Sequence, residues 1–116
     1  MSKIRAYAAT AAGAALEPFE FDPGPLGDEQ VEIAVDYCGI CHSDLSVIHN
    51  SWGNAQFPLV PGHEISGRIV ATGDKVKKVK AGDRVGLGWF SGSCMSCPDC
   101  LRGDQNLCPN GEDTII

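Results

Sequence analysis

Residues 92–109 read GSCMSCPDCLRGDQNLCP and contain four of the six cysteines in this 116-residue chain: Cys94, Cys97, Cys100 and Cys108. Cysteines at such short spacing can bring four thiolates to one tetrahedral metal ion without help from distant parts of the chain. Zinc favours this donor set, and a site filled by four protein ligands stabilises a loop but leaves no position for substrate. We therefore expect a structural zinc lobe over residues 91–111, with irregular backbone organised by the cysteines, and any catalysis elsewhere.

Two other uses of this loop are open, namely a disulfide pair and an iron–sulfur cluster. The run Cys-x2-Cys-x2-Cys followed by Cys-Pro is similar to a bacterial ferredoxin pattern, but seven residues precede the last cysteine where that pattern has three. The spacing therefore favours zinc. A colourless protein would support zinc, and a brown one would indicate an iron–sulfur cluster.

The composition indicates one ordinary soluble domain. Hydrophobic residues make up 43% and charged residues 21% of the chain, and its length suffices for one core but not for two ordinary domains. The net charge of −6 argues against nucleic acid and anionic membranes as partners. No apolar stretch approaches the ~20 residues of a membrane span, and the N-terminus has no secretory apolar run. We expect a cytoplasmic protein, whose cysteines bind metal or act in redox chemistry rather than form disulfides.

The hydrophobic pattern predicts a mainly β fold. Alternation is clearest over residues 29–38, where Val31, Ile33, Val35 and Tyr37 share one face of a half-buried strand. Proline and glycine turns separate further expected strands, at residues 3–8, 19–21, 65–71 and 84–87.

Other segments are shorter or less regular. Ser43 and Asp44 predict the start of a short helix that runs through His49, whereas residues 8–15 are ambiguous because Gly13 interrupts them. Residues 114–116 are apolar and strand-like, as if the chain stopped within a strand. These features predict one barrel-like β domain that is incomplete at its C-terminus.

A second group of metal-binding residue types is divided between two segments. Residues 38–44 read CGICHSD, and residues 62–67 read GHEISG. Together with the four-cysteine loop and the spacing of Gly67, Gly73 and Val76, these segments resemble the zinc-dependent medium-chain alcohol dehydrogenases, especially their cinnamyl-type and related bacterial branch. The resemblance covers the chain from end to end. It implies a GroES-like β-barrel catalytic domain with a short helix, of which residues 1–116 form the N-terminal part, without the dinucleotide-binding domain.

The resemblance also implies two zinc ions. Cys41 and His63 would be ligands of a catalytic zinc with a position open for substrate oxygen. Glu64 would either contact these ligands without binding the metal or act as an exchangeable ligand. The structural zinc would be held by Cys94, Cys97, Cys100 and Cys108. The third protein ligand of the catalytic zinc, a cysteine in this family, would lie outside residues 1–116.

Five further residues match functional positions of the family. Asp44 would orient the ring of His63 through its second nitrogen, and Ser43 would pass the substrate proton away from the metal. His42 would lie near the pyrophosphate of the cofactor, and Trp52 and Trp89 would line the substrate pocket.

The implied activity is the interconversion of primary alcohols and aldehydes by zinc-assisted hydride transfer to NAD or NADP, in a protein that forms a homo-oligomer at full length. The sequence departs from the family at Ser46, where many relatives have a proton-relay histidine; His49 is the nearest substitute. No Gly-x-Gly-x-x-Gly follows an expected strand. We therefore expect residues 1–116 to be inactive by themselves.

Simpler interpretations remain beside this one. The chain may be read as a stand-alone zinc-stabilised β interaction module without catalysis, which would bind one zinc ion where the enzyme binds about two. Cys38 and Cys41 also match a thioredoxin-like redox pair, although Cys38 is expected to be a small core residue. Trp52 and Trp89 would then be core aromatics, and His42 an ordinary surface histidine.

Overall fold

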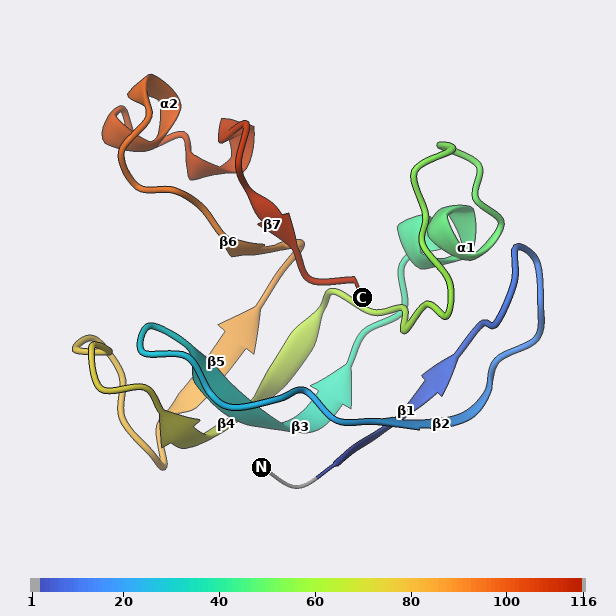
Figure 1. Cartoon of the computed structure of the whole chain (residues 1–116), viewed down its shortest axis with the longest axis horizontal. Helices are drawn as coiled ribbons and strands as arrows, with labels where there is room; N and C mark the ends of the chain where they lie inside the picture. Colours follow the sequence, from blue (N-terminus) through green and yellow to red (C-terminus); the bar gives the residue numbers. More distant parts are fainter. Residues whose placement is uncertain (1–2, 116) are drawn as a thin grey trace.

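The computed structural model describes residues 3–115 and is mainly β, with three small antiparallel sheets (Figure 1). One sheet pairs β1 (Ile4–Ala8) with β2 (Glu17–Phe21). The largest sheet has the order β3 (Val31–Cys38), β4 (Ile65–Thr72) and β5 (Arg84–Leu87). The third sheet pairs β6 (Phe90–Gly92) with β7 (Glu112–Asp113). The helices are α1 (His42–Ile48), α2 (Pro98–Leu101) and the 3-10 turn η1 (Gln105–Leu107).

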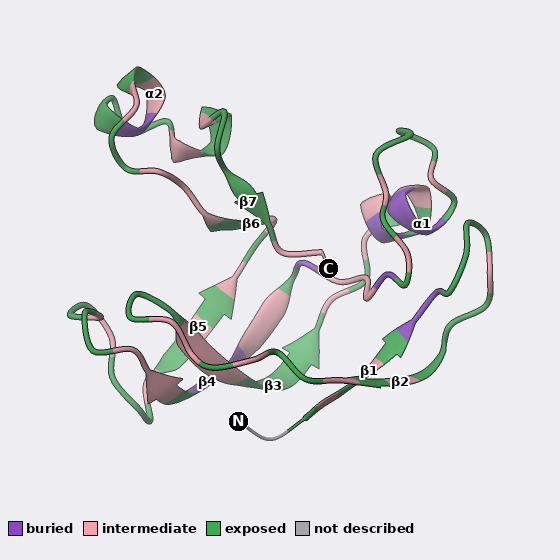
Figure 2. Cartoon of the chain, in the orientation of Figure 1, coloured by how far each residue is buried: buried purple, intermediate pink, exposed green. Residues whose placement is uncertain are grey.

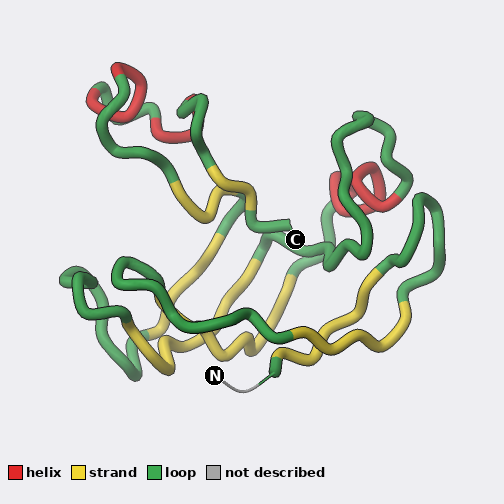
Figure 3. The backbone as a smooth tube through the Cα atoms, viewed as in Figure 1, coloured by secondary structure: helices red, strands yellow, loops and turns green. Residues whose placement is uncertain are grey.

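The predicted strands are confirmed, with small shifts at their ends. The strand expected at residues 84–87 has the observed bounds of β5, and those expected at 3–8, 19–21, 29–38 and 65–71 correspond to β1, β2, β3 and β4. Figure 3 shows how little of the chain is helical. The ambiguous segment 8–15 is not a helix: Ala9 forms an isolated bridge with Leu59, and Gly13 turns the chain with a φ of 72°.

The expected buried face of β3 is wrong in its second half. Val35 and Tyr37 are 55% and 75% exposed, whereas Val31 and Ile33 are partly buried. The pairing with β4 shifts its register between Glu32 and Ile33 and again after Val35. From residue 34 to residue 38 the side chains of both faces are exposed, so within residues 3–115 nothing covers either face of this half of the strand, and the alternation read from the sequence does not correspond to a buried face there. Figure 2 shows this strand largely exposed.

The core lies between β1, α1 and the loop that leads to β4. Ala9, Val47, Ile48 and Leu59 are buried together. Ala9 and Leu59 also exchange two backbone hydrogen bonds, each 2.9 Å long, so the end of β1 is fastened to the segment before residue 63. Partly buried apolar residues complete this cluster: Ala55, Phe57, Trp89 and Ile115.

Helix α1 is confirmed, but its cap lies two residues before Ser43, the first residue of the predicted start, and its last residue is Ile48, with His49 as the C-cap. Its N-cap is Cys41, so Ser43 lies within the first turn and is not the cap. Asp44, at the third helical position, reaches back and accepts a hydrogen bond of 3.1 Å from the Cys41 backbone N–H. This bond satisfies an amide that the start of a helix otherwise leaves without a partner.

The four-cysteine segment projects from the rest of the molecule on the base formed by β6 and β7 (Figure 1). Its backbone is largely irregular, as expected, apart from the single turns α2 and η1. The prediction of a strand at residues 114–116 is wrong for Thr114 and Ile115, which follow β7 and belong to no strand. Ile116 lies outside the described residues. Within residues 3–115 no helix has the length and apolar character needed to cross a membrane.

Candidate metal centres and an adjoining pocket

The four cysteines of the projecting lobe converge on one point. The Sγ atoms of Cys94, Cys97, Cys100 and Cys108 all lie within 4.8 Å of one another. Cys94 Sγ and Cys100 Sγ are 3.9 Å apart, well beyond the ~2.05 Å of a disulfide, and all six cysteines of the chain are free. The structure therefore disagrees with the disulfide interpretation and presents a compact set of four sulfur donors.

Backbone amides surround these sulfur atoms. The Cys97 N–H donates to Cys94 Sγ at 3.2 Å, the Cys94 N–H to Cys108 Sγ at 3.4 Å, and the Cys100 N–H to Cys97 Sγ at 3.4 Å. The last bond forms because Cys97 is the N-cap of α2, with Pro98 as its first residue. Hydrogen bonds from amides favour the thiolate form, which is the form that binds metal.

The thiols of this lobe differ in acidity because they share one small space. The backbone and hydroxyl of Ser96, with the Cys97 amide, lower the pKa of Cys94 to about 6. The Cys100 amide lowers the pKa of Cys97, but burial and the neighbouring sulfur atoms outweigh it and raise the pKa to about 11. The thiols of Cys94 and Cys97 therefore differ in acidity, and a divalent cation bound at the cluster would favour the thiolate form.

A second cluster joins the two segments identified by sequence. Ligand atoms of Cys41, His63 and Glu64 lie within 4.8 Å of one another. Antiparallel pairing of β3 with β4 sets Cys38 opposite Ile65, so the residues after β3 lie beside those before β4. A Gly39 N–H to Glu64 C=O bond of 2.9 Å continues this pairing.

Asp44 fastens the two halves of this second cluster together. Its side chain is buried and accepts from the Cys41 N–H and the Gly62 N–H, both at 3.1 Å. Its Oδ1 atom also lies 2.9 Å from Nδ1 of His63. With Nδ1 hydrogen-bonded to a carboxylate, the other ring nitrogen, Nε2, remains for the cluster.

Two glycines leave the space that this arrangement needs. A Cβ at Gly39 would lie 2.2 Å from Oε2 and 3.0 Å from Cβ of Glu64. At Gly62 the φ angle is +121°, and a Cβ there would lie 2.8 Å from Sγ of Cys38. Any larger residue at either position would displace a side chain of the cluster or its neighbour. Both glycines lie in the two quoted segments, 38–44 and 62–67, but no pattern in the sequence indicates that their Cα atoms lie this close to Glu64 and Cys38.

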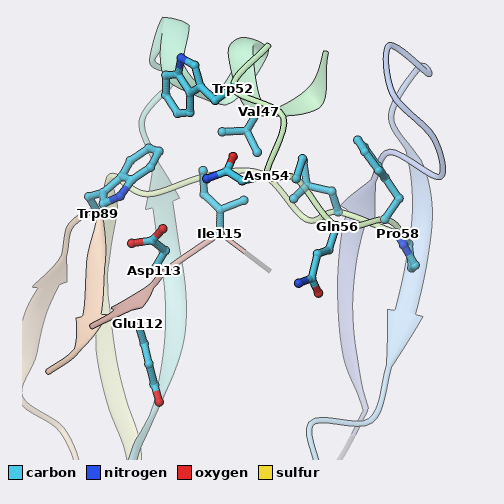
Figure 4. A pocket seen from close by; sticks show the side chains of 12 residues that line it. Val47, Trp52, Asn54, Gln56, Pro58, Trp89, Glu112, Asp113 and Ile115 are labelled. Atoms are coloured by element: carbon cyan, nitrogen blue, oxygen red, sulfur yellow. The ribbon is translucent and has the colours of Figure 1, made fainter. Parts of the chain in front are cut away.

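A pocket of about 640 Å³ opens beside the second cluster. Trp89 connects the two: its ring lies edge-on to His63, with centroids 4.7 Å apart, and edge-on to Trp52, with centroids 5.9 Å apart. Both tryptophans line the pocket, together with Val47 of α1 and Ile115 (Figure 4). The structure thus brings Trp52, Trp89 and His63 to one place.

The remaining predicted site residues lie around α1. Ser43 is half-buried in its first turn, next to Cys41, whereas His42 is exposed at its first position. His49, the possible replacement for a relay histidine, is exposed at the opposite end of the helix. Cys38 was expected in the core but is exposed, and it does not belong to the cluster of Cys41.

The pocket includes polar residues that the sequence did not single out. Asn54, Gln56 and Asp113 are among its lining residues. Asp113 lies in the polar stretch 110–114 after the last cysteine and Asn54 and Gln56 lie in the loop after α1, and neither segment carries a motif that would have indicated a pocket.

Comparisons with known proteins agree with this architecture. The family described as the alcohol dehydrogenase GroES-like domain matches residues 27–115. An aldehyde reductase of Synechocystis is 58% identical over 113 residues, which are 97% of this chain and 34% of the relative.

Two solved structures are similar over nearly the whole chain. A cinnamyl alcohol dehydrogenase of Sorghum bicolor has a TM-score of 0.92 at 46% identity, covering 98% of this chain and 32% of that protein. The protein CAD of Helicobacter pylori, in complex with NADP(H), has a TM-score of 0.92 at 35% identity, covering 97% of this chain and 32% of that protein. The chain thus spans about a third of the length of these relatives. It belongs to the alcohol dehydrogenase GroES-like domain family.

Proposed function

We propose that residues 1–116 are the N-terminal part of the catalytic domain of a zinc-dependent alcohol dehydrogenase. The parent enzyme would interconvert primary alcohols and aldehydes with NAD or NADP. The single observation that carries this proposal is the pairing of two unlike metal clusters in one small domain. One has four cysteines and is closed, whereas the other, with Cys41, His63 and Glu64, adjoins an aromatic pocket.

The donor atoms of both clusters suit zinc. Four sulfur atoms with amide donors around them match a structural site, and one thiol, one imidazole and one carboxylate match a site that retains a position for another ligand. The lowered pKa of Cys94 further favours a metal-binding thiolate. We assign the first set to structural zinc and the second to catalytic zinc.

Zinc at the second cluster would act as a Lewis acid that makes an alcohol more acidic, and the nicotinamide cofactor would accept the hydride. The chain itself supplies orientation. Asp44 accepts from His63 Nδ1 and from two backbone amides, so it holds Cys41 and His63 at a fixed separation. The edge of Trp89 against His63 restricts rotation of the imidazole from the other side.

Two residues of α1 complete the proposed site. Ser43, half-buried next to Cys41, would receive the proton of the substrate at its Oγ atom and pass it toward solvent. Exposed His42 would contact the cofactor, which a domain outside these residues would bind. Glu64 would act as an exchangeable third ligand within the chain.

The printed names of the relatives support the substrate class. The Synechocystis relative is an aldehyde reductase and the Sorghum relative a cinnamyl alcohol dehydrogenase. Assembly into a homo-oligomer, the absence of nucleic-acid and membrane partners, and a cytoplasmic location stay predictions from the sequence.

Cobalt(II) titration of the 116-residue chain tests this proposal. We expect a first equivalent to bind tightly at the four cysteines and a second, weaker equivalent at Cys41 and His63, with thiolate-to-cobalt absorption for both. A Cys41→Ser variant should lose only the second. A stand-alone zinc-stabilised module would bind one equivalent, unaffected by Cys41→Ser. In a polypeptide that also contains a dinucleotide-binding domain, the same variant should abolish NAD(P)-linked alcohol oxidation.

A further inference from the structure

The pocket beside the second cluster has two chemically different walls (Figure 4). Trp52, Trp89 and Val47 form an apolar wall, to which Ile115 adds from the opposite side. Asp113 brings a carboxylate to the same space. Because Trp89 also contacts His63, a molecule between the tryptophans and Asp113 would lie next to the metal cluster.

Asp113 and its neighbour Glu112 both line the pocket, but their side chains point in different directions (Figure 4). In Figure 4 the Asp113 carboxylate lies between Trp89 and Ile115, whereas the Glu112 side chain extends away from them. Alternation along the short strand β7 explains the difference. Glu112 instead covers Gly92, where a Cβ would lie 3.1 Å from its Oε2 atom.

The charge of Asp113 is not balanced locally. No lysine or arginine lines the pocket, and within residues 3–115 no salt bridge involves Asp113. The chain as a whole carries a net charge of −6. Asp113 is itself exposed, so its effect within the pocket is that of a partly solvated charge.

We propose that Asp113 makes this pocket discriminate by charge, so that alcohols and aldehydes that carry a carboxylate bind more weakly than uncharged ones of the same shape. The inference rests on the proposed function only in identifying the pocket as the substrate site. The indole rings of Trp52 and Trp89 offer a flat substrate ring edge and face contacts, which are favourable beyond simple burial. Like charges about 7 Å apart at a partly solvated site weaken binding by roughly fivefold to tenfold.

The chain contains its own reporter of this selectivity. Its two tryptophans, Trp52 and Trp89, both line the pocket, so all tryptophan fluorescence comes from that site. We would titrate the 116-residue chain with benzamide and with benzoate, planar rings of similar size that differ in charge. Benzamide should bind roughly fivefold to tenfold more tightly than benzoate at low ionic strength, and less so in high salt.

A matched pair of variants separates the carboxylate that faces Trp89 from the neighbouring carboxylate that points away from it (Figure 4). Asp113→Asn and Glu112→Gln each remove one negative charge, from neighbouring residues of β7. We expect Asp113→Asn to reduce the preference for benzamide to less than about twofold and Glu112→Gln to retain it. Equal affinities in the unaltered chain, no binding of either ring, or equal effects of the two variants would overturn the inference.

Collisional quenching gives a second measurement that needs no bound ring. Iodide, an anion, should quench the tryptophans less efficiently than neutral acrylamide, and Asp113→Asn should raise the iodide-to-acrylamide ratio more than Glu112→Gln does. If neither variant changes the ratio of iodide quenching to acrylamide quenching, the inference is also contradicted. Because neither readout involves metal or hydride transfer, its failure is distinguishable from failure of the proposed function.

Discussion

The Nδ1 atom of His63 lies 2.9 Å from the Oδ1 atom of Asp44, although 19 residues separate them in the chain. The same Oδ1 atom accepts from the Gly62 N–H, and Oδ2 accepts from the Cys41 N–H. One buried carboxylate therefore joins the start of α1 to the loop before β4, and it fixes which nitrogen of His63 faces the metal cluster. The helix cap and the metal site are one structural unit.

Replacing Asp44 by asparagine should loosen this unit. An amide group cannot accept all three hydrogen bonds, so we expect the free energy of unfolding to fall by about 1–3 kcal/mol. Affinity for a metal at Cys41 and His63 should fall roughly 10- to 100-fold, because the imidazole loses its orienting carboxylate. Urea unfolding and chelator competition measure the two effects. Asp36→Asn, at an exposed position of β3, should change neither; equal effects of the two variants would contradict the role given to Asp44.

Replacing Cys100 by serine should remove the metal of the projecting lobe alone. Cys100 is the buried member of the four, and its thiol cannot be replaced by a hydroxyl as a zinc ligand of comparable strength. Metal analysis should show one equivalent fewer than in the unaltered chain. The exposed Cys38 is the matched control, since Cys38→Ser removes a thiol outside both clusters and should leave the metal content unchanged. Loss of metal in both variants would contradict the assignment.

Much of this architecture could be predicted from local sequence. Short cysteine spacing requires proximity whatever the fold, so the convergence of Cys94 and Cys100 followed from their separation in the chain. Strands β1 to β5 appeared as apolar runs between turns. The pairing of Cys41 with His63 was different: spacing does not predict it, and only the resemblance to a family did.

Other features depended on tertiary detail that no pattern carries. Tyr37 is exposed because the described part of the chain leaves both faces of β3 uncovered from residue 34 to residue 38, whereas simple alternation placed it with the buried residues. Nothing in the sequence distinguishes Gly39 from other loop glycines. The structure shows that the carboxylate of Glu64 occupies the space that a Cβ at this position would need. Asp113 enters the pocket because the four-cysteine lobe folds back and pairs β7 with β6, a long-range contact that its neighbours in sequence do not specify.

Replacing Gly39 by alanine should disturb the second cluster but leave the lobe intact. The new methyl group would lie within 3.0 Å of both Cβ and Oε2 of Glu64, so this side chain must move away from its present position. We expect weaker metal binding at Cys41 and His63, measured by cobalt titration, with an unchanged first equivalent at the lobe. Gly88→Ala is the control, because a Cβ there meets nothing within 4 Å. Unchanged affinity in Gly39→Ala would show that Glu64 contributes nothing to the cluster.

The turn before β5 should make stability depend on pH in the acid range. Lys80 donates to Asp83 through its side chain at 2.9 Å and through its backbone N–H at 3.0 Å, and both bonds lower the pKa of Asp83 from its ordinary value of 3.8. A lowered pKa in the folded state stabilises the fold above pH 3.8, and this contribution is lost as the pH falls through the folded-state value.

The difference in unfolding free energy between the unaltered chain and Asp83→Asn should therefore be constant near neutral pH and shrink below pH 3.8. Comparing the two proteins at each pH cancels effects common to both, including loss of metal in acid. Lys80→Met removes the side-chain donor but keeps the backbone donor. The difference in unfolding free energy between the unaltered chain and Lys80→Met should therefore be smaller, with the same pH dependence. A difference that grows as the pH falls would have the wrong sign and would contradict the argument.

Replacing Leu59 by alanine tests the core behind the site. Leu59 is 3% exposed, packs in the cluster with Val47 and Ile48, and bonds through its backbone to Ala9. Removing a buried leucine side chain should lower the free energy of unfolding by about 2–4 kcal/mol, because its contacts are lost and a cavity remains. Leu101→Ala, at a position that is 75% exposed, should cost almost nothing. Since Leu59 also lines the pocket, the larger cavity should increase quenching of the partly buried Trp89 by acrylamide. A Leu59→Ala variant as stable as Leu101→Ala would show that this cluster does not hold the pocket and the cap of α1 together.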